Sequence, residues 1–188
     1  NSRDAEHAGT TGKAASYGEG ITGRGLDLTG AAVHRYPVDL GAGLEFTADG
    51  DFSVEVWVRM RAGLPDDNRI IGNMDGDSGW RGTTGETLGW AIRSHPGGSW
   101  EWQIVGPAVQ EEEGPKRKAT TTVGMMFRGI DRDNPSYAYR PTPERQPVND
   151  GNWHQLAFSL DRSLDEARLY YDGTNVAIYD TGWLGSLA

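Results

Sequence analysis

The chain has 188 residues, enough for a single domain spanning 1–188 with a sizeable core, and 18 basic against 27 acidic residues give it a formal net charge of −9. This acidic balance repels phosphate backbones and anionic lipid headgroups, which excludes nucleic acid as an expected partner. No apolar run is long enough to span a bilayer, so we expect no membrane insertion. The absence of cysteine excludes disulfides, thiolate metal sites and cysteine nucleophiles.

The N-terminal quarter predicts little regular structure before one clear strand. Residues 1–22 are rich in glycine, alanine, threonine and charge, and we expect irregular chain there, with at most a short edge strand. Residues 25–30 alternate and end on a turn, and 34–40 alternate around a proline that favours an edge strand. Residues 52–60 place five apolar side chains on one face, each worth roughly 1.5–3 kcal/mol if buried. Trp57 lies on the opposite face of this strand, so that face does not consist of polar, solvent-exposed side chains alone.

The middle of the chain predicts a short strand at 68–74 and a hairpin from 88–94 and 99–105, with a glycine-rich turn between them. Residues 106–122 carry runs of opposite charge around Gly-Pro, which indicates a solvated surface loop. Another strand is predicted at 123–127.

The next segment, 131–148, contains four prolines, and we interpret it as a second long loop. Long ordered loops often carry function, so its part 131–145 is where we expect specificity.

The stretch 153–173 has apolar residues at alternate positions on both sides of a polar run, and it ends in Asp172-Gly173, a strong turn signal. We interpret it as two antiparallel strands. A helix is the alternative, because Ser163 and Glu166 have capping-box spacing, but the β-rich run before the turn fits a strand better.

A last strand is predicted at 175–179, and no segment predicts a helix longer than a turn. Many short strands with turn signals about every 8–12 residues predict an all-β sandwich or barrel.

The order of these segments resembles the laminin-G-like, concanavalin-A-like jelly roll of secreted bacterial proteins over residues 23–180. The segments that carry the resemblance are GRGLDLTG at 23–30, a Tyr-x-Val edge strand, FSVEVWVR at 52–59, GW at 89–90, DGNWH at 150–154 and LYYDG at 169–173. The resemblance implies two antiparallel sheets packed face to face. Members of this family usually continue with further strands after the Asp-Gly hairpin, so we expect the chain to be a piece of a longer polypeptide.

The resemblance implies little about chemistry, because the fold hosts lectins, glycosidases, lyases and adhesion modules. Glycosidases of this fold carry Glu-x-Asp-x-x-Glu on one strand, and that spacing is absent here. Glu55 and Glu101 stand alone, no Gly-x-Ser-x-Gly elbow is present, and His154 is expected to be structural. We therefore do not expect this chain to be an enzyme.

Calcium is the most plausible metal, because hard cations take several oxygen ligands from a loop. Asp75 and Asp77 resemble the start of an EF-hand loop, although its twelfth position is not acidic. Asp131 and Asp133 form a second candidate. The resemblance offers a third at the turn 26–30, whose acidic partner in the C-terminal strands is missing.

Aromatic side chains are the remaining signal, because sugars stack their C–H faces on Trp and Tyr while polar neighbours bind the hydroxyls. The alternative is that a sandwich core absorbs these rings. The candidate residues for a sugar platform are Trp57, Trp100, Trp102, Tyr137, Tyr139 and Arg140.

The sequence thus predicts a non-catalytic module of a larger secreted, periplasmic or cell-surface protein that binds a glycan or polysaccharide. One alternative is an accessory domain that packs against a catalytic domain, such as a glycosidase, sulfatase or phosphoesterase, without a ligand of its own. A third is an enzyme that degrades polysaccharide.

Overall fold

The computed structural model divides the chain into two compact units, 1–46 and 47–188, where the sequence predicts one domain. Its described residues include no helix long and apolar enough to cross a membrane. For 125–128, 136 and 137 the structure describes the backbone alone. The described residues are 16–28, 50–62, 69–73, 89–95, 97–106, 125–128 and 136–185.

The first unit contains an antiparallel hairpin of β1 (Ser16–Glu19) and β2 (Arg24–Asp27). Gly23 takes a φ of 67° in its turn, a conformation that glycine adopts without strain. The guanidinium of Arg24 lies 5.6 Å from the ring centre of Tyr17 and donates to its backbone oxygen. The short strand expected within 1–22 is therefore present.

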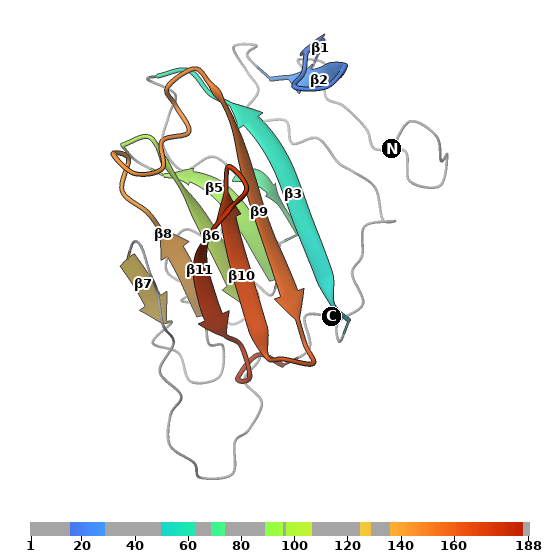
Figure 1. Ribbon diagram of the computed structural model, residues 1–188, viewed down its shortest axis with the longest axis vertical. Coiled ribbons are helices and arrows are strands. Elements are labelled where there is room, and N and C mark those ends of the chain that lie inside the picture. The colour runs from blue at the N-terminus through green and yellow to red at the C-terminus, as the bar shows by residue number, and fades with distance from the viewer. Residues whose placement is uncertain are drawn as a thin grey trace. The chain divides into compact units, whose positions relative to one another are not determined.

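The second unit contains a four-stranded antiparallel sheet in the order β11-β10-β9-β3 (Figure 1). The hairpin predicted at 153–173 is confirmed as β9 and β10, and the helix alternative is wrong. Asp165 and Asp172 take φ values of 53° and 47° in the turns on either side of β10. The four strands are β3 (Phe52–Arg59), β9 (Trp153–Asp161), β10 (Glu166–Tyr171) and β11 (Thr174–Asp180).

A five-stranded antiparallel sheet lies behind the first, in the order β4-β5-β6-β8-β7 (Figure 1). The hairpin predicted from 88–94 and 99–105 is confirmed as β5 and β6. Its turn includes Gly97 and Gly98, both with positive φ. At Gly98 a Cβ atom would lie 2.2 Å from the Asn149 side chain, so only glycine fits there. The strands are β4 (Arg69–Gly72), β5 (Gly89–His95), β6 (Ser99–Val105), β7 (Met125–Arg128) and β8 (Ser136–Arg140).

Strand β8 corrects the interpretation of 131–148 as one long loop. The strand runs between two prolines, Pro135 and Pro141, and pairs with β6 on one side and β7 on the other. Proline cannot donate to a ladder, but both prolines lie outside the paired residues. The two tyrosines at alternate positions were the strand signal that the prolines hid.

Aromatic contacts join the inner faces of the two sheets. The Phe158 ring on β9 lies 5.0 Å from Trp90 and 5.8 Å from Trp102, between ring centres. Tyr179 on β11 lies 5.4 Å from Trp102, and its hydroxyl donates to the backbone oxygen of Ala138 on β8. Edge-to-face and tilted ring pairs of this kind add to the burial of apolar area. The second unit is therefore a two-layer β-sandwich.

Two further expectations lie outside the described residues. They are the edge strand at 34–40 and, apart from Gly106, the surface loop at 106–122.

Candidate ligand-binding face

Three of the residues expected in a sugar platform belong to the core. Trp100, Trp102 and Tyr139 are fully buried on the inner face of the five-stranded sheet. The Trp100 indole nitrogen donates to Gln146 Oε1 at 2.9 Å, and its ring packs 5.3 Å from Tyr139. Burial raises the pKa of Tyr139, although the Gln146 hydrogen bond opposes the shift. No ring in this position can stack on a ligand at the surface, so this part of the prediction is wrong.

Arg140 lies on the outer face of the five-stranded sheet, where it neutralises a buried acid. Its Nε donates to Glu101 Oε2 at 2.9 Å, and its Nη2 contacts the same oxygen. Glu101 also lies directly opposite Arg93 in the β5–β6 ladder. The Glu101 side chain is only 3% exposed and that of Arg140 14%, so this pair does not offer open groups to a sugar. The backbone of Tyr137 lies opposite Ile104, and its side chain is outside the described residues.

Trp57 is the predicted platform residue that the structure leaves open. It lies on the outer face of the four-stranded sheet and is 40% exposed. Its indole nitrogen donates to Glu55 Oε1 at 3.2 Å, and Gln155 Nε2 donates to the same oxygen at 2.7 Å. One carboxylate oxygen therefore holds two neighbouring side chains of this face in fixed orientations.

Two aromatic rings that the sequence did not single out also lie on this outer face. Trp153 lies opposite Arg59 and is half-buried, with the guanidinium 4.9 Å from its ring centre. Tyr170 on β10 lies opposite Ala157. The alternation of 153–173 already separates these outward residues from the buried ones, but only the strand register shows where they lie relative to Trp57.

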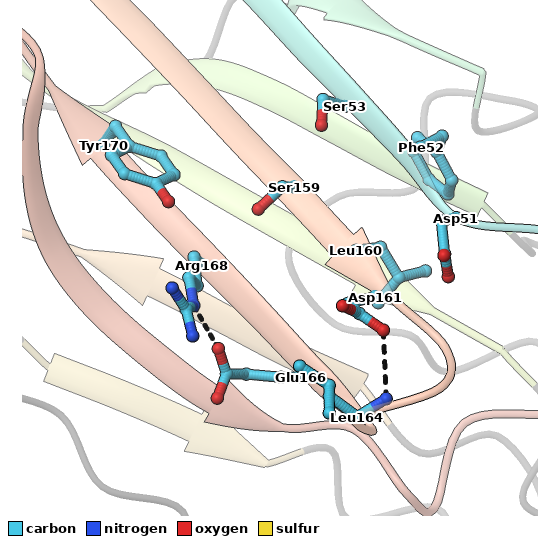
Figure 2. A pocket seen from close by; sticks show the side chains of 10 residues that line it. All are labelled: Asp51, Phe52, Ser53, Ser159, Leu160, Asp161, Leu164, Glu166, Arg168 and Tyr170. Atoms are coloured by element: carbon cyan, nitrogen blue, oxygen red, sulfur yellow. Dashed lines mark hydrogen bonds and ion pairs between the residues drawn. The ribbon is translucent and has the colours of Figure 1, made fainter.

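A pocket of about 410 Å³ opens on the same face, near the turn between β9 and β10 (Figure 2). Its centre is a row of opposed residues on three strands: Ser53 lies opposite Ser159, and Ser159 lies opposite Arg168. Figure 2 shows the Tyr170 hydroxyl and the two serine hydroxyls around one open space. The pocket therefore combines an aromatic ring with hydrogen-bonding groups.

Carboxylates surround the lower part of the pocket. Asp161 Oδ1 accepts hydrogen bonds from the Ser163 hydroxyl at 2.7 Å and from the Leu164 backbone at 3.0 Å. These bonds, that of Ser163 first, lower the pKa of Asp161. Asp51 Oδ1 accepts from the Arg162 backbone at 2.7 Å. Within the described part of the chain, the second carboxylate oxygen of Asp51 has no hydrogen bond, which leaves an acceptor for a ligand hydroxyl.

The pocket has an acidic balance. Glu166 forms an ion pair with Arg168, and Asp51 and Asp161 add two more carboxylates, so that three acids accompany one cation in the lining. An anionic ligand would meet like charges here, whereas a polyol would meet carboxylate acceptors and serine hydroxyls.

His154 lies away from this face, in a network that suits a structural role. Its Nδ1 is 2.9 Å from Asp172 Oδ2 and 2.7 Å from Tyr171 Oη, and its Nε2 is 3.1 Å from Asp150 Oδ1. Tyr171 donates its own proton to the backbone oxygen of Pro147. Burial disfavours the imidazolium, but the hydrogen bonds to Asp172 and Asp150 outweigh it and raise the pKa of His154. With both nitrogens engaged, His154 is not available as a base.

Asp150 is itself held in its charged form. The backbone N–H and the side-chain amide of Asn152 both donate to it at 2.9 Å. These two bonds, followed by that of His154, lower the pKa of Asp150 to about 2. The network therefore joins the loop before β9 to the turn after β10 through charge-assisted hydrogen bonds.

The expected calcium ligands Asp75, Asp77, Asp131 and Asp133 lie outside the described residues. Among the residues that the structure describes, no group of three or more histidine or acidic side chains is arranged to hold a metal ion. A comparison with known proteins found no protein-family model and no curated protein that matches this chain.

Proposed function

We propose that this chain is a non-catalytic module that binds an uncharged glycan on the outer face of its four-stranded sheet. The observation that carries the proposal is Trp57, an indole that is 40% exposed and held in place by Glu55. A sugar ring would stack its C–H face on this indole. The nearby pocket would supply acceptors and hydroxyls for the sugar hydroxyls.

A glycan fits this face better than an apolar ligand does. The outward side chains near Trp57 and in the pocket include hydroxyl, amide and carboxylate groups, among them Ser53, Ser159 and Gln155. The carboxylates nearby disfavour nucleic acid and anionic lipid for the same reason as the overall charge of −9. A glycan ligand also agrees with a secreted, periplasmic or cell-surface location.

An accessory domain that packs against a catalytic neighbour is the second candidate. Two apolar side chains favour it: Leu164 is 64% exposed in the β9–β10 turn, and Ile178 is 41% exposed on the edge strand β11. A partner domain that covered both would remove this apolar area from water. In that case the chain would bind no glycan, and Leu164→Ser with Ile178→Ser would weaken domain docking.

The test of the first proposal is binding of the isolated chain to insoluble and soluble neutral polysaccharides: cellulose, xylan, laminarin and starch. We expect at least one to bind, and Trp57→Ala to weaken that binding at least about tenfold. Trp57→Phe keeps a ring and should retain part of the affinity. Tyr17→Ala is the matched control, because Tyr17 is a 59% exposed aromatic residue of the first unit. The proposal fails if no polysaccharide binds, or if both alanine variants behave alike.

A further inference from the structure

We infer that the ligand of this face is a linear, uncharged oligosaccharide that contacts Trp57 and the pocket at the same time, so that the face holds at least two separate sugar subsites. This inference rests on the proposed function and deepens it. Its basis is the arrangement of outward residues along β3, β9 and β10, together with the charge of the pocket.

The two subsites are too far apart for one monosaccharide. Trp57 and Ser53 both point outward from β3 and lie four residues apart, a separation of about 13 Å at the rise of an extended strand. Trp57 lies toward the C-terminal end of β3, and Ser53 belongs to the pocket near its N-terminal end. A ligand that uses both must be a chain.

The residues between the two ends allow a chain to lie close to the sheet. Strand β9 runs between β3 and β10, and its outward residues in this part are Ala157 and Ser159, both small. Tyr170 lies opposite Ala157, and Arg168 lies opposite Ser159. The larger β10 side chains therefore border the small β9 side chains, and a sugar chain that ran from Trp57 would pass Tyr170 before it reached Arg168.

The pocket end selects against negative charge on the ligand. Arg168, a cation of the pocket lining, is engaged by Glu166, and Asp51 and Asp161 add negative charge. Their carboxylate oxygens accept hydrogen bonds from hydroxyls but repel carboxylates and sulfates. The hydroxyls of an uncharged sugar can donate to these carboxylate oxygens, and no charge on the ligand has to be removed from water.

The experiment is a chain-length series measured by isothermal titration calorimetry. The neutral probes are cello-, xylo-, laminari- and malto-oligosaccharides from monosaccharide to hexasaccharide. The anionic probes are oligogalacturonides of the same lengths. We expect affinity in one neutral series to rise at least about tenfold between disaccharide and hexasaccharide. The oligogalacturonide series should bind more weakly, because its carboxylates would meet the negative charge of Asp51 and Asp161.

Variants separate the two subsites. Trp57→Ala should weaken the binding of every length that binds. Arg168→Ala and Tyr170→Ala should weaken the hexasaccharide about tenfold and the disaccharide less than about twofold. Arg145→Ala is the matched control for Arg168→Ala, because Arg145 is exposed on the loop before β9 and does not line the pocket. Thermal unfolding of each variant confirms that it is folded.

The outcomes distinguish the inference from the proposed function. If no polysaccharide or oligosaccharide binds, both fail. If a neutral sugar binds with an affinity that does not depend on length, or if Arg168→Ala and Tyr170→Ala leave hexasaccharide binding unchanged, the two-subsite inference fails and glycan binding stands. Tighter binding of the oligogalacturonides overturns the assignment of an uncharged ligand.

Discussion

Each outer face of the sandwich carries an arginine–glutamate ion pair, and the two pairs differ in their exposure to solvent. On the five-stranded sheet, Arg140 and Glu101 are 14% and 3% exposed. On the four-stranded sheet, Arg168 and Glu166 are 48% and 25% exposed. The first pair neutralises charges that are removed from water, whereas the second borders an open pocket. Burial, and not residue type, decides which outer face can meet a ligand.

The tryptophans give the largest expected difference between an inner and an outer face. Trp102→Ala removes a ring packed between Phe158 and Tyr179 and should lower the free energy of unfolding by about 3–5 kcal/mol. Trp57→Ala, on the outer face, should lower it by less than about 1 kcal/mol. Urea denaturation of both variants measures this. Equal losses would show that the Trp57 indole is needed for the fold and would weaken its assignment to a ligand.

The two ion pairs give the next largest difference. Arg140→Ala leaves the Glu101 carboxylate buried without its main cation and should destabilise the sandwich by about 3 kcal/mol. Arg168→Ala breaks an exposed pair and should leave stability nearly unchanged. The midpoint of urea unfolding reports both. If the two variants were equally stable, the buried ion pair would contribute no more to stability than the exposed one, and the contrast in burial between the two faces would have no energetic consequence.

A smaller, pH-dependent effect is expected from His154, which lies outside both pairs. Its folded-state pKa is raised, so its contribution to stability is fully present below the unfolded pKa of 6.5 and is lost as pH rises through the folded value. The free energy of unfolding should therefore fall as pH rises above about 6.5. His154→Gln should be less stable at pH 6 and should lose this decline. A decline of equal size in the variant would assign it to another group.

Alternation was sufficient to predict the strands that are buried on one face. The apolar residues of 52–60 and the repeated pattern of 153–173 identified β3, β9 and β10, because one side of each strand must face the core. It also predicted that Trp57 points away from that core. Strand β8 was missed because its tyrosine pattern lies between two prolines, which usually mark loops.

The candidate site was harder to predict than the fold. Trp100 and Trp102 share one face of β6, but alternation does not say which face packs against the other sheet, because Glu101 and Gln103 on the opposite face are buried as well. The pocket depends on Ser53, Ser159 and Arg168, which come together only through the register of three strands. Register depends on pairing across the sheet, and local sequence carries little of that information.

The carboxylate oxygen of Glu55 that accepts from both Trp57 and Gln155 has a consequence for the kinetics of the glycan binding proposed for this face. A ring already fixed by such a bond loses little rotational freedom when a ligand arrives, so association should proceed in one step without a preceding rearrangement. Selectivity among sugars would then appear as differences in residence time, with the association rate nearly constant.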